Sequence, residues 1–171
     1  TPVHRTPRVV ATNRQAATID VDVWVLPHSL RTPVPAAIDR ATDGELGRAV
    51  ERGEFIGAAF ETSVARLTGW KARYVVLVGV GAAEGVTAGT LRRAATVGAL
   101  AARGRKLPRV GVLVPDALAG QMPRAVQSVV EGVIVANYDG GTYKTTSTSR
   151  FWIEECVVRV DAADSTVTDA A

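Results

Sequence analysis

The chain has 171 residues, of which 47% are hydrophobic and 22% charged, proportions that are typical of one folded domain and exclude a chain disordered throughout. The formal net charge of +3 is too small to indicate a nucleic-acid-binding protein by itself. A single cysteine excludes a disulfide within the chain. No stretch approaches the ~20 apolar residues of a membrane span, so we expect a cytoplasmic protein with no membrane partner.

The two ends of the chain differ in composition from its middle. Residues 1–16 are polar, basic and without periodicity, and they predict a flexible arm. Residues 161–171 are small and polar, and they predict a tail or the start of an inter-domain linker. The folded domain is therefore expected over residues 17–160.

The first half of this domain begins with residues 19–25, whose alternating apolar side chains predict a strand. A short helix is expected over 36–40, after two prolines. Asp43 is a suitable cap for a second helix that ends near Gly53. Residues 61–67 predict an exposed strand.

The second half has the clearest pattern. Continuous apolar runs at 74–78 and 110–114 predict strands buried on both faces. Between them, Thr87 or Thr90 is suited to cap a helix. Apolar residues at spacings of three and four from Met122 to Ala136 predict a strong amphipathic helix, and a last strand is expected over 151–160. This order of strands and helices predicts a largely parallel sheet with right-handed crossovers.

The turn after the first buried strand is a candidate anion site. Gly79, Val80, Gly81 and Ala82 follow a strand and precede a helix, where backbone N–H groups and the helix dipole favour a phosphate. However, neither the third glycine of a dinucleotide-binding turn nor the lysine of a P-loop is present, and Glu84 would repel an anion. A tight structural turn is the alternative.

Basic residues gather after the helix that follows this turn. The candidate patch consists of Arg103, Arg105, Lys106 and Arg109. Such a patch can contact nucleic acid or an acidic partner, and an ordinary solvated surface near a helix C-terminus is the alternative.

No residue pattern indicates catalysis or metal binding. His4 and His28 are the two histidines, and neither has a further ligand at a metal-site spacing. Cys156 stands in an apolar run, which predicts a buried structural thiol rather than a nucleophile. We therefore expect no catalytic residue, metal or cofactor in this chain.

Three segments together resemble the N-terminal domain of the leucyl aminopeptidases of peptidase family M17. They are the strand and glycine turn at 75–81, the helix start at 90–95, and the run from Glu131-Gly132 through Asn137-Tyr138 to Tyr143-Lys144-Thr145. The resemblance implies a macro-domain-like three-layer α/β/α sandwich with a mostly parallel mixed sheet.

The same resemblance implies a non-catalytic domain with an assembly or regulatory role. In that family the zinc or manganese ions and the catalytic residues belong to a larger C-terminal domain. The expected partners are other copies of the chain or such a catalytic domain. Two alternatives stay open: a stand-alone macro-like module that binds a nucleotide or another anionic ligand, and a DNA-contacting domain.

Overall fold

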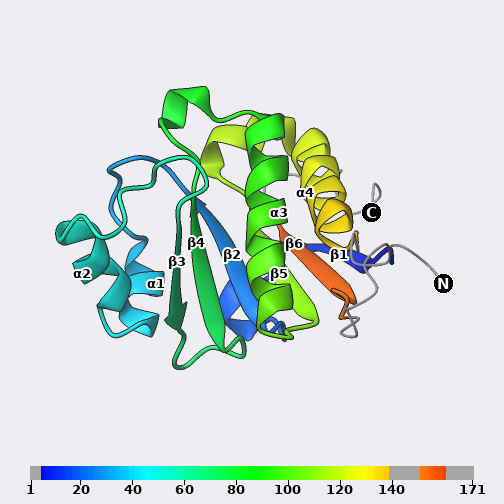
Figure 1. The fold of residues 1–171 in the computed structure, drawn as a ribbon, viewed down its shortest axis with the longest axis horizontal. Coiled ribbons are helices and arrows are strands. Elements are labelled where there is room, and N and C mark those ends of the chain that lie inside the picture. Colours follow the sequence, from blue (N-terminus) through cyan, green and yellow to red (C-terminus); the bar gives the residue numbers. More distant parts are fainter. Residues whose placement is uncertain (1–4, 139–150, 161–171) are drawn as a thin grey trace, which may run out of the picture.

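The computed structural model of the protein describes residues 5–138 and 151–160. Its centre is a six-stranded sheet with the order β1-β6-β5-β2-β4-β3 (Figure 1). The strands are β1 (Arg8–Thr12), β2 (Val23–His28), β3 (Thr62–Arg66), β4 (Tyr74–Gly79), β5 (Arg109–Leu113) and β6 (Glu155–Arg159). All neighbouring strands are parallel except β3, which is antiparallel to β4 at one edge. The predicted mostly parallel mixed sheet is therefore confirmed.

Helices cover both faces of this sheet. The helices α3 (Ala88–Gly104) and α4 (Met122–Ala136) lie side by side on one face, and α1 (Ala36–Ala41) and α2 (Glu45–Glu51) lie on the other side near β3 (Figure 1). Short 3-10 turns occur at Ala16–Thr18 (η1), Ala83–Gly85 (η2) and Asp116–Gln121 (η3). The predicted three-layer sandwich is confirmed.

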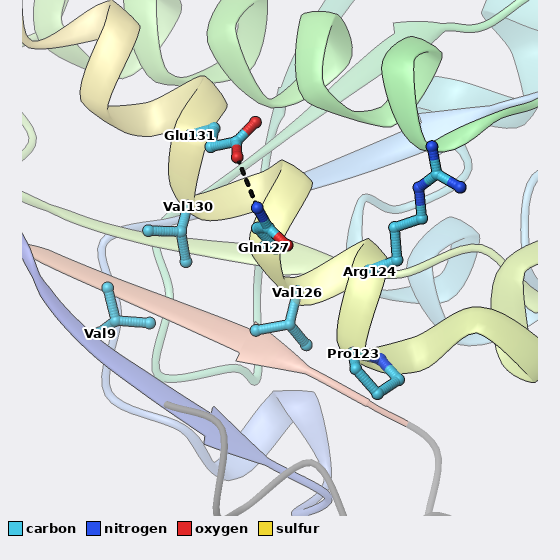
Figure 2. A pocket seen from close by; sticks show the side chains of 7 residues that line it. All are labelled: Val9, Pro123, Arg124, Val126, Gln127, Val130 and Glu131. Atoms are coloured by element: carbon cyan, nitrogen blue, oxygen red, sulfur yellow. Dashed lines mark hydrogen bonds between the residues drawn. The ribbon is translucent and has the colours of Figure 1, made fainter.

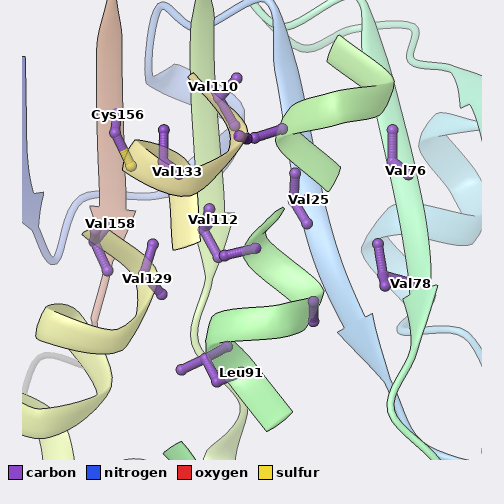
Figure 3. Packing of buried hydrophobic residues seen from close by; sticks show 14 of the residues in the cluster. Val25, Val76, Val78, Leu91, Val110, Val112, Val129, Val133, Cys156 and Val158 are labelled. Atoms are coloured by element: carbon purple, nitrogen blue, oxygen red, sulfur yellow. The ribbon is translucent and has the colours of Figure 1, made fainter. Parts of the chain in front are cut away.

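Each face of the sheet has its own apolar core. Valines of the parallel strands, together with Leu91 of α3 and Val129 and Val133 of α4, fill the space between the sheet and the two long helices (Figure 3). On the opposite face Trp24, Leu46 and Phe55 pack with the strands β3 and β4. The β-branched residues of the strands thus contribute side chains to the apolar cores on both faces of the sheet, as the continuous apolar runs predicted.

The helix α3 begins where the sequence predicts, and α4 packs closely against it. Thr87 is the N-cap of α3, and its side chain and that of Thr90 form a capping box. Gly132 of α4 lies so close to α3 that an added Cβ would overlap the carbonyl oxygen of Arg92. Glycine is needed at this position because the two helix backbones approach each other there.

The prediction of a flexible arm over 1–16 is wrong for Arg8–Thr12. These residues form β1, which pairs in parallel with β6 in the register Val9 to Cys156 and Ala11 to Val158. The side chain of Ala11 packs on the core beneath α4. The local sequence gives no sign of this strand because its hydrogen-bonding partner stands about 147 positions later.

Three element boundaries also differ from the predictions. The first predicted strand begins at Val23 instead of residue 19, because the backbone turns at Ile19–Val21, where the N–H of Val21 donates to the carbonyl oxygen of Ile19 at 3.0 Å. Asp43 does not cap α2: the N-cap is Gly44, and Asp43 itself has a φ of 54°. The last strand begins at Glu155 instead of residue 151.

Candidate functional site

The turn from Gly79 to Ala82, the candidate anion site, is held by internal hydrogen bonds. The N–H of Gly79 donates to the carbonyl oxygen of Glu61 at 2.7 Å, that of Val80 to His28 at 3.0 Å, and that of Gly81 to Gly57 at 3.0 Å. These three N–H groups are therefore not available to an anion in this conformation. The geometry agrees with the alternative reading, a tight structural turn.

The glycines of this turn allow a close approach of two backbone segments. An added Cβ at Gly79 would overlap the carbonyl oxygen of Ala58, and Gly81 has a φ of 76°. The segment that approaches is fixed by Glu61, whose Oε2 accepts hydrogen bonds from the N–H groups of Ile56, Gly57 and Ala58 at 3.1, 3.0 and 3.2 Å. The carboxylate of Glu61 thus occupies the concave arrangement of backbone N–H groups at Ile56–Ala58, a geometry that typically binds an anion.

Two of the four residues in the predicted basic patch, Arg103 and Arg109, contact distant segments of the chain, while among the described residues the Arg105 side chain donates only to the carbonyl oxygen of Ala101 in the adjoining helix α3, at 3.4 Å. Arg103 donates from Nε to the carbonyl oxygen of Phe151 at 3.1 Å and from Nη1 to that of Ala136. Its guanidinium also lies 5.8 Å from the centre of the Trp152 ring. Arg103 therefore joins the ends of α3 and α4 to the segment that leads into β6.

Arg109 is engaged at the start of β5. Its guanidinium forms ion pairs with Asp20 at 2.9 Å and with Asp22 at 3.1 Å. Hydrogen bonding to Asp22 and then to Asp20 raises the pKa of Arg109 above its usual range. Arg105 and Lys106 are exposed, so the structure leaves two of the four predicted cations on an open surface.

The other titratable candidates are structural. His28 is buried, and its Nε2 lies 2.9 Å from the carbonyl oxygen of Thr32. Cys156 is buried as predicted, and burial raises the pKa of its thiol to about 12. Within residues 5–138 and 151–160, no three His, Cys, Asp or Glu side chains converge as a metal site would require. Among the same residues, no helix combines the length and apolar character needed to cross a lipid bilayer.

A groove that the sequence did not indicate lies between β1 and α4. It has a volume of about 730 Å³, and its lining residues are Val9, Pro123, Arg124, Val126, Gln127, Val130 and Glu131 (Figure 2). Valines line its floor, and polar side chains stand along one side. No sequence signal could have revealed it, since Val9 belongs to a strand that the sequence did not predict.

A second apolar hollow lies on the outer face of the helix layer. It has a volume of about 490 Å³ and is lined by Phe60, Arg92, Arg93, Thr96, Val97 and Val135. Val135 is 58% exposed, and Leu100, in the same helix as Val97, is 49% exposed.

Comparison with known proteins gives the family. The model of the cytosol aminopeptidase family, N-terminal domain, matches residues 25–147. The chain belongs to this family. As expected from the resemblance, the matched part is the N-terminal domain of these aminopeptidases.

Curated relatives of this M17 domain are much longer than the chain itself. A probable cytosol aminopeptidase of Syntrophotalea carbinolica is 35% identical over 109 residues, which cover 63% of this chain and 22% of that protein. A probable cytosol aminopeptidase of Geobacter sp. (strain M21) is 35% identical over 119 residues, which cover 68% of this chain and 24% of that protein. The chain therefore spans less than a quarter of the length of these relatives.

Solved structures support the fold of the M17 domain. A tomato leucine aminopeptidase mutant superposes with a TM-score of 0.77 at 14% identity, over 96% of this chain and 34% of that one. A Trypanosoma brucei macrodomain in complex with ADP superposes with a TM-score of 0.60 at 16% identity, over 95% of this chain and 67% of that one. The expected macro-domain-like fold is thus confirmed.

Proposed function

We propose that this M17 N-terminal domain is a non-catalytic assembly domain, which binds either further copies of the chain or the catalytic domain of an M17 aminopeptidase. The groove between β1 and α4 is the observation that carries this proposal. Its apolar floor is formed by Val9, Val126 and Val130, and burying such side chains against a partner is favourable.

The position of the groove supports a polypeptide partner. β1 is at the edge of the sheet, and an edge strand presents backbone groups that another chain segment can pair with. The last residue described, Val160, donates its N–H to the carbonyl oxygen of Thr12 in this same strand. Val160 is therefore bonded to the same strand that contributes Val9 to the groove.

Neither the Gly79–Ala82 turn nor the predicted basic patch gains a specific observation that favours its alternative function. The N–H groups of the Gly79–Ala82 turn are mostly used internally, and Arg103 and Arg109 are paired within the domain. The zinc or manganese ions that the family resemblance implies for a catalytic domain, and a cytoplasmic location, stay predictions.

Sedimentation velocity tests the proposal. The chain is examined alone and mixed with the separately produced catalytic part of the Syntrophotalea relative, and we expect a complex in at least one case. Val130→Glu places a charge in the groove and should abolish the complex, whereas Val135→Glu, a matched change on the same helix outside the groove, should preserve it. Complexes that survive Val130→Glu in a protein with native circular dichroism would contradict the proposal, as would hydrolysis of leucine p-nitroanilide by the chain alone with Zn²⁺ or Mn²⁺.

A further inference from the structure

A polar hollow between the N-terminus of α3 and the first half of α4 adjoins the groove and shares Arg124, Gln127 and Glu131 with it. Its volume is about 310 Å³, and it is lined by Ala88, Gly89, Arg92, Arg124, Gln127, Ser128 and Glu131. We propose that this hollow binds the phosphate group of a small molecule. This inference does not rest on the assembly role, because its ligand and its measurement are different.

The first contribution comes from the start of α3. The side-chain Oγ1 of Thr87 accepts a hydrogen bond from the N–H of Thr90, and its carbonyl oxygen accepts one from the N–H of Leu91. The N–H groups of Ala88 and Gly89 have no acceptor within the helix, because no turn precedes them, and no other hydrogen bond among the described residues uses them. They stand at the positive end of a helix of 17 residues, where a phosphate is stabilised.

Ser128 supplies an independent sign of a ligand. This residue is 8% exposed and lines the hollow from α4. Its hydroxyl makes no hydrogen bond to any residue that the structure describes, although serines within helices commonly donate to the carbonyl four residues earlier. Among the described residues only Trp24 Nε1 is a fully buried polar side-chain atom without a partner, so the Ser128 hydroxyl stays within reach of a ligand that accepts its hydrogen bond.

The charges around the hollow also favour an anion. The one lining carboxylate, Glu131, lies 3.7 Å from the guanidinium of Arg92 and accepts a hydrogen bond from Gln127 at 2.9 Å. Arg124 forms no ion pair with any described side chain, and its guanidinium extends from α4 toward α3 (Figure 2). A cation beside the positive end of a helix is unfavourable unless an anion lies between them.

Phosphate suits this set of donors. A guanidinium presents parallel N–H groups that match two phosphate oxygens, and Ala88, Gly89 and Ser128 line the same hollow. The volume of about 310 Å³ is at the lower limit of small-molecule sites. A phosphate with a small attached group therefore fits better than a large polyanion.

The test is a titration of the folded chain with inorganic phosphate at constant ionic strength, followed by two-dimensional ¹⁵N–¹H NMR. We expect saturable shifts of the Ala88 and Gly89 amide signals that chloride does not produce. Arg124→Gln and Ser128→Ala should each weaken phosphate binding, by about tenfold for the charge. Both variants should stay folded, because neither side chain makes a bond within the described structure.

The matched control is Arg93→Gln, which removes the same charge from an exposed residue of α3 that does not line the hollow. It should leave phosphate binding unchanged, while Glu131→Gln should strengthen it by removing a carboxylate. A parallel titration with adenosine 5′-monophosphate separates the ligand sources: tighter binding than inorganic phosphate indicates a phosphomonoester, and equal binding indicates free phosphate. Equal weakening by Arg93→Gln and Arg124→Gln, or a chloride response like that of phosphate, would overturn the proposal.

Discussion

The side-chain amide of Asn137 makes two hydrogen bonds to the backbone of Ile153: its Nδ2 donates to the carbonyl oxygen at 2.8 Å, and its Oδ1 accepts from the N–H, also at 2.8 Å. Asn137 is fully buried at the C-terminal end of α4, and Nδ2 also donates to the carbonyl oxygen of Arg5 at 2.9 Å. One side chain thus fixes the end of α4 to the segments that lead into β6 and β1.

Replacing this amide should be among the most damaging polar substitutions in the domain. Asn137→Ala leaves the N–H and the carbonyl of Ile153 without partners, and we expect the free energy of unfolding to fall by about 3 kcal/mol. Urea denaturation followed by circular dichroism measures this. Gln127→Ala, an exposed change in the same helix, should alter stability by no more than about 0.5 kcal/mol. Similar values for the two variants would contradict the bridging role of Asn137.

Replacing either of two helical glycines by alanine should change the stability of the protein, and the two changes should have opposite signs. Gly132→Ala places a Cβ against the backbone of α3, and this overpacking should cost about 1–2 kcal/mol of stability. Gly104→Ala, at the end of α3 with open space around it, should stabilise the protein by up to about 1 kcal/mol through helix propensity. Thermal denaturation of both variants tests the difference, and an increase in Tm for Gly132→Ala would show that the two helices are not in such close contact.

The carboxylate of Glu61 should stabilise the turn that follows β4. Glu61→Ala removes the acceptor of three backbone N–H groups, and we expect a loss of about 2 kcal/mol, while Glu61→Gln, which keeps an oxygen but no charge, should lose about half as much. Hydrogen exchange of the Gly57 and Ala58 amides should become faster in both variants. The exposed Glu54→Ala gives the baseline, and unchanged exchange in Glu61→Ala would exclude the proposed contacts.

The thiol of Cys156 should be inert in the native protein. Burial raises its pKa from the ordinary value of 9.0 to about 12, so in the folded state it stays protonated and inaccessible to iodoacetamide. Because the unfolded chain releases this proton at lower pH than the folded one, stability should fall as the pH rises from about 9 to about 12. Cys156→Ala should remove that part of the decline. Rapid alkylation at pH 8.5 without denaturant would refute the buried position.

The sequence by itself determined the elements whose patterns are local. The strands β4 and β5, the helix α4 and the Thr87 cap of α3 lie close to their predicted positions, because periodicity and capping depend on residues a few positions apart. The resemblance of three short segments was enough to identify the family. Burial of Cys156 followed from its apolar neighbours.

Only the tertiary structure decided which polar groups are free to bind something. Arg103 and Arg109 could not be distinguished from Arg105 and Lys106 by sequence, because their partners Phe151 and Asp22 are far away in the chain. The same holds for the N–H groups of the Gly79–Gly81 turn, for β1 and for the groove beside it. Hydrogen bonds and ion pairs join residues through space, so a sequence pattern shows which groups are present, and the packing of distant segments determines which of them remain accessible.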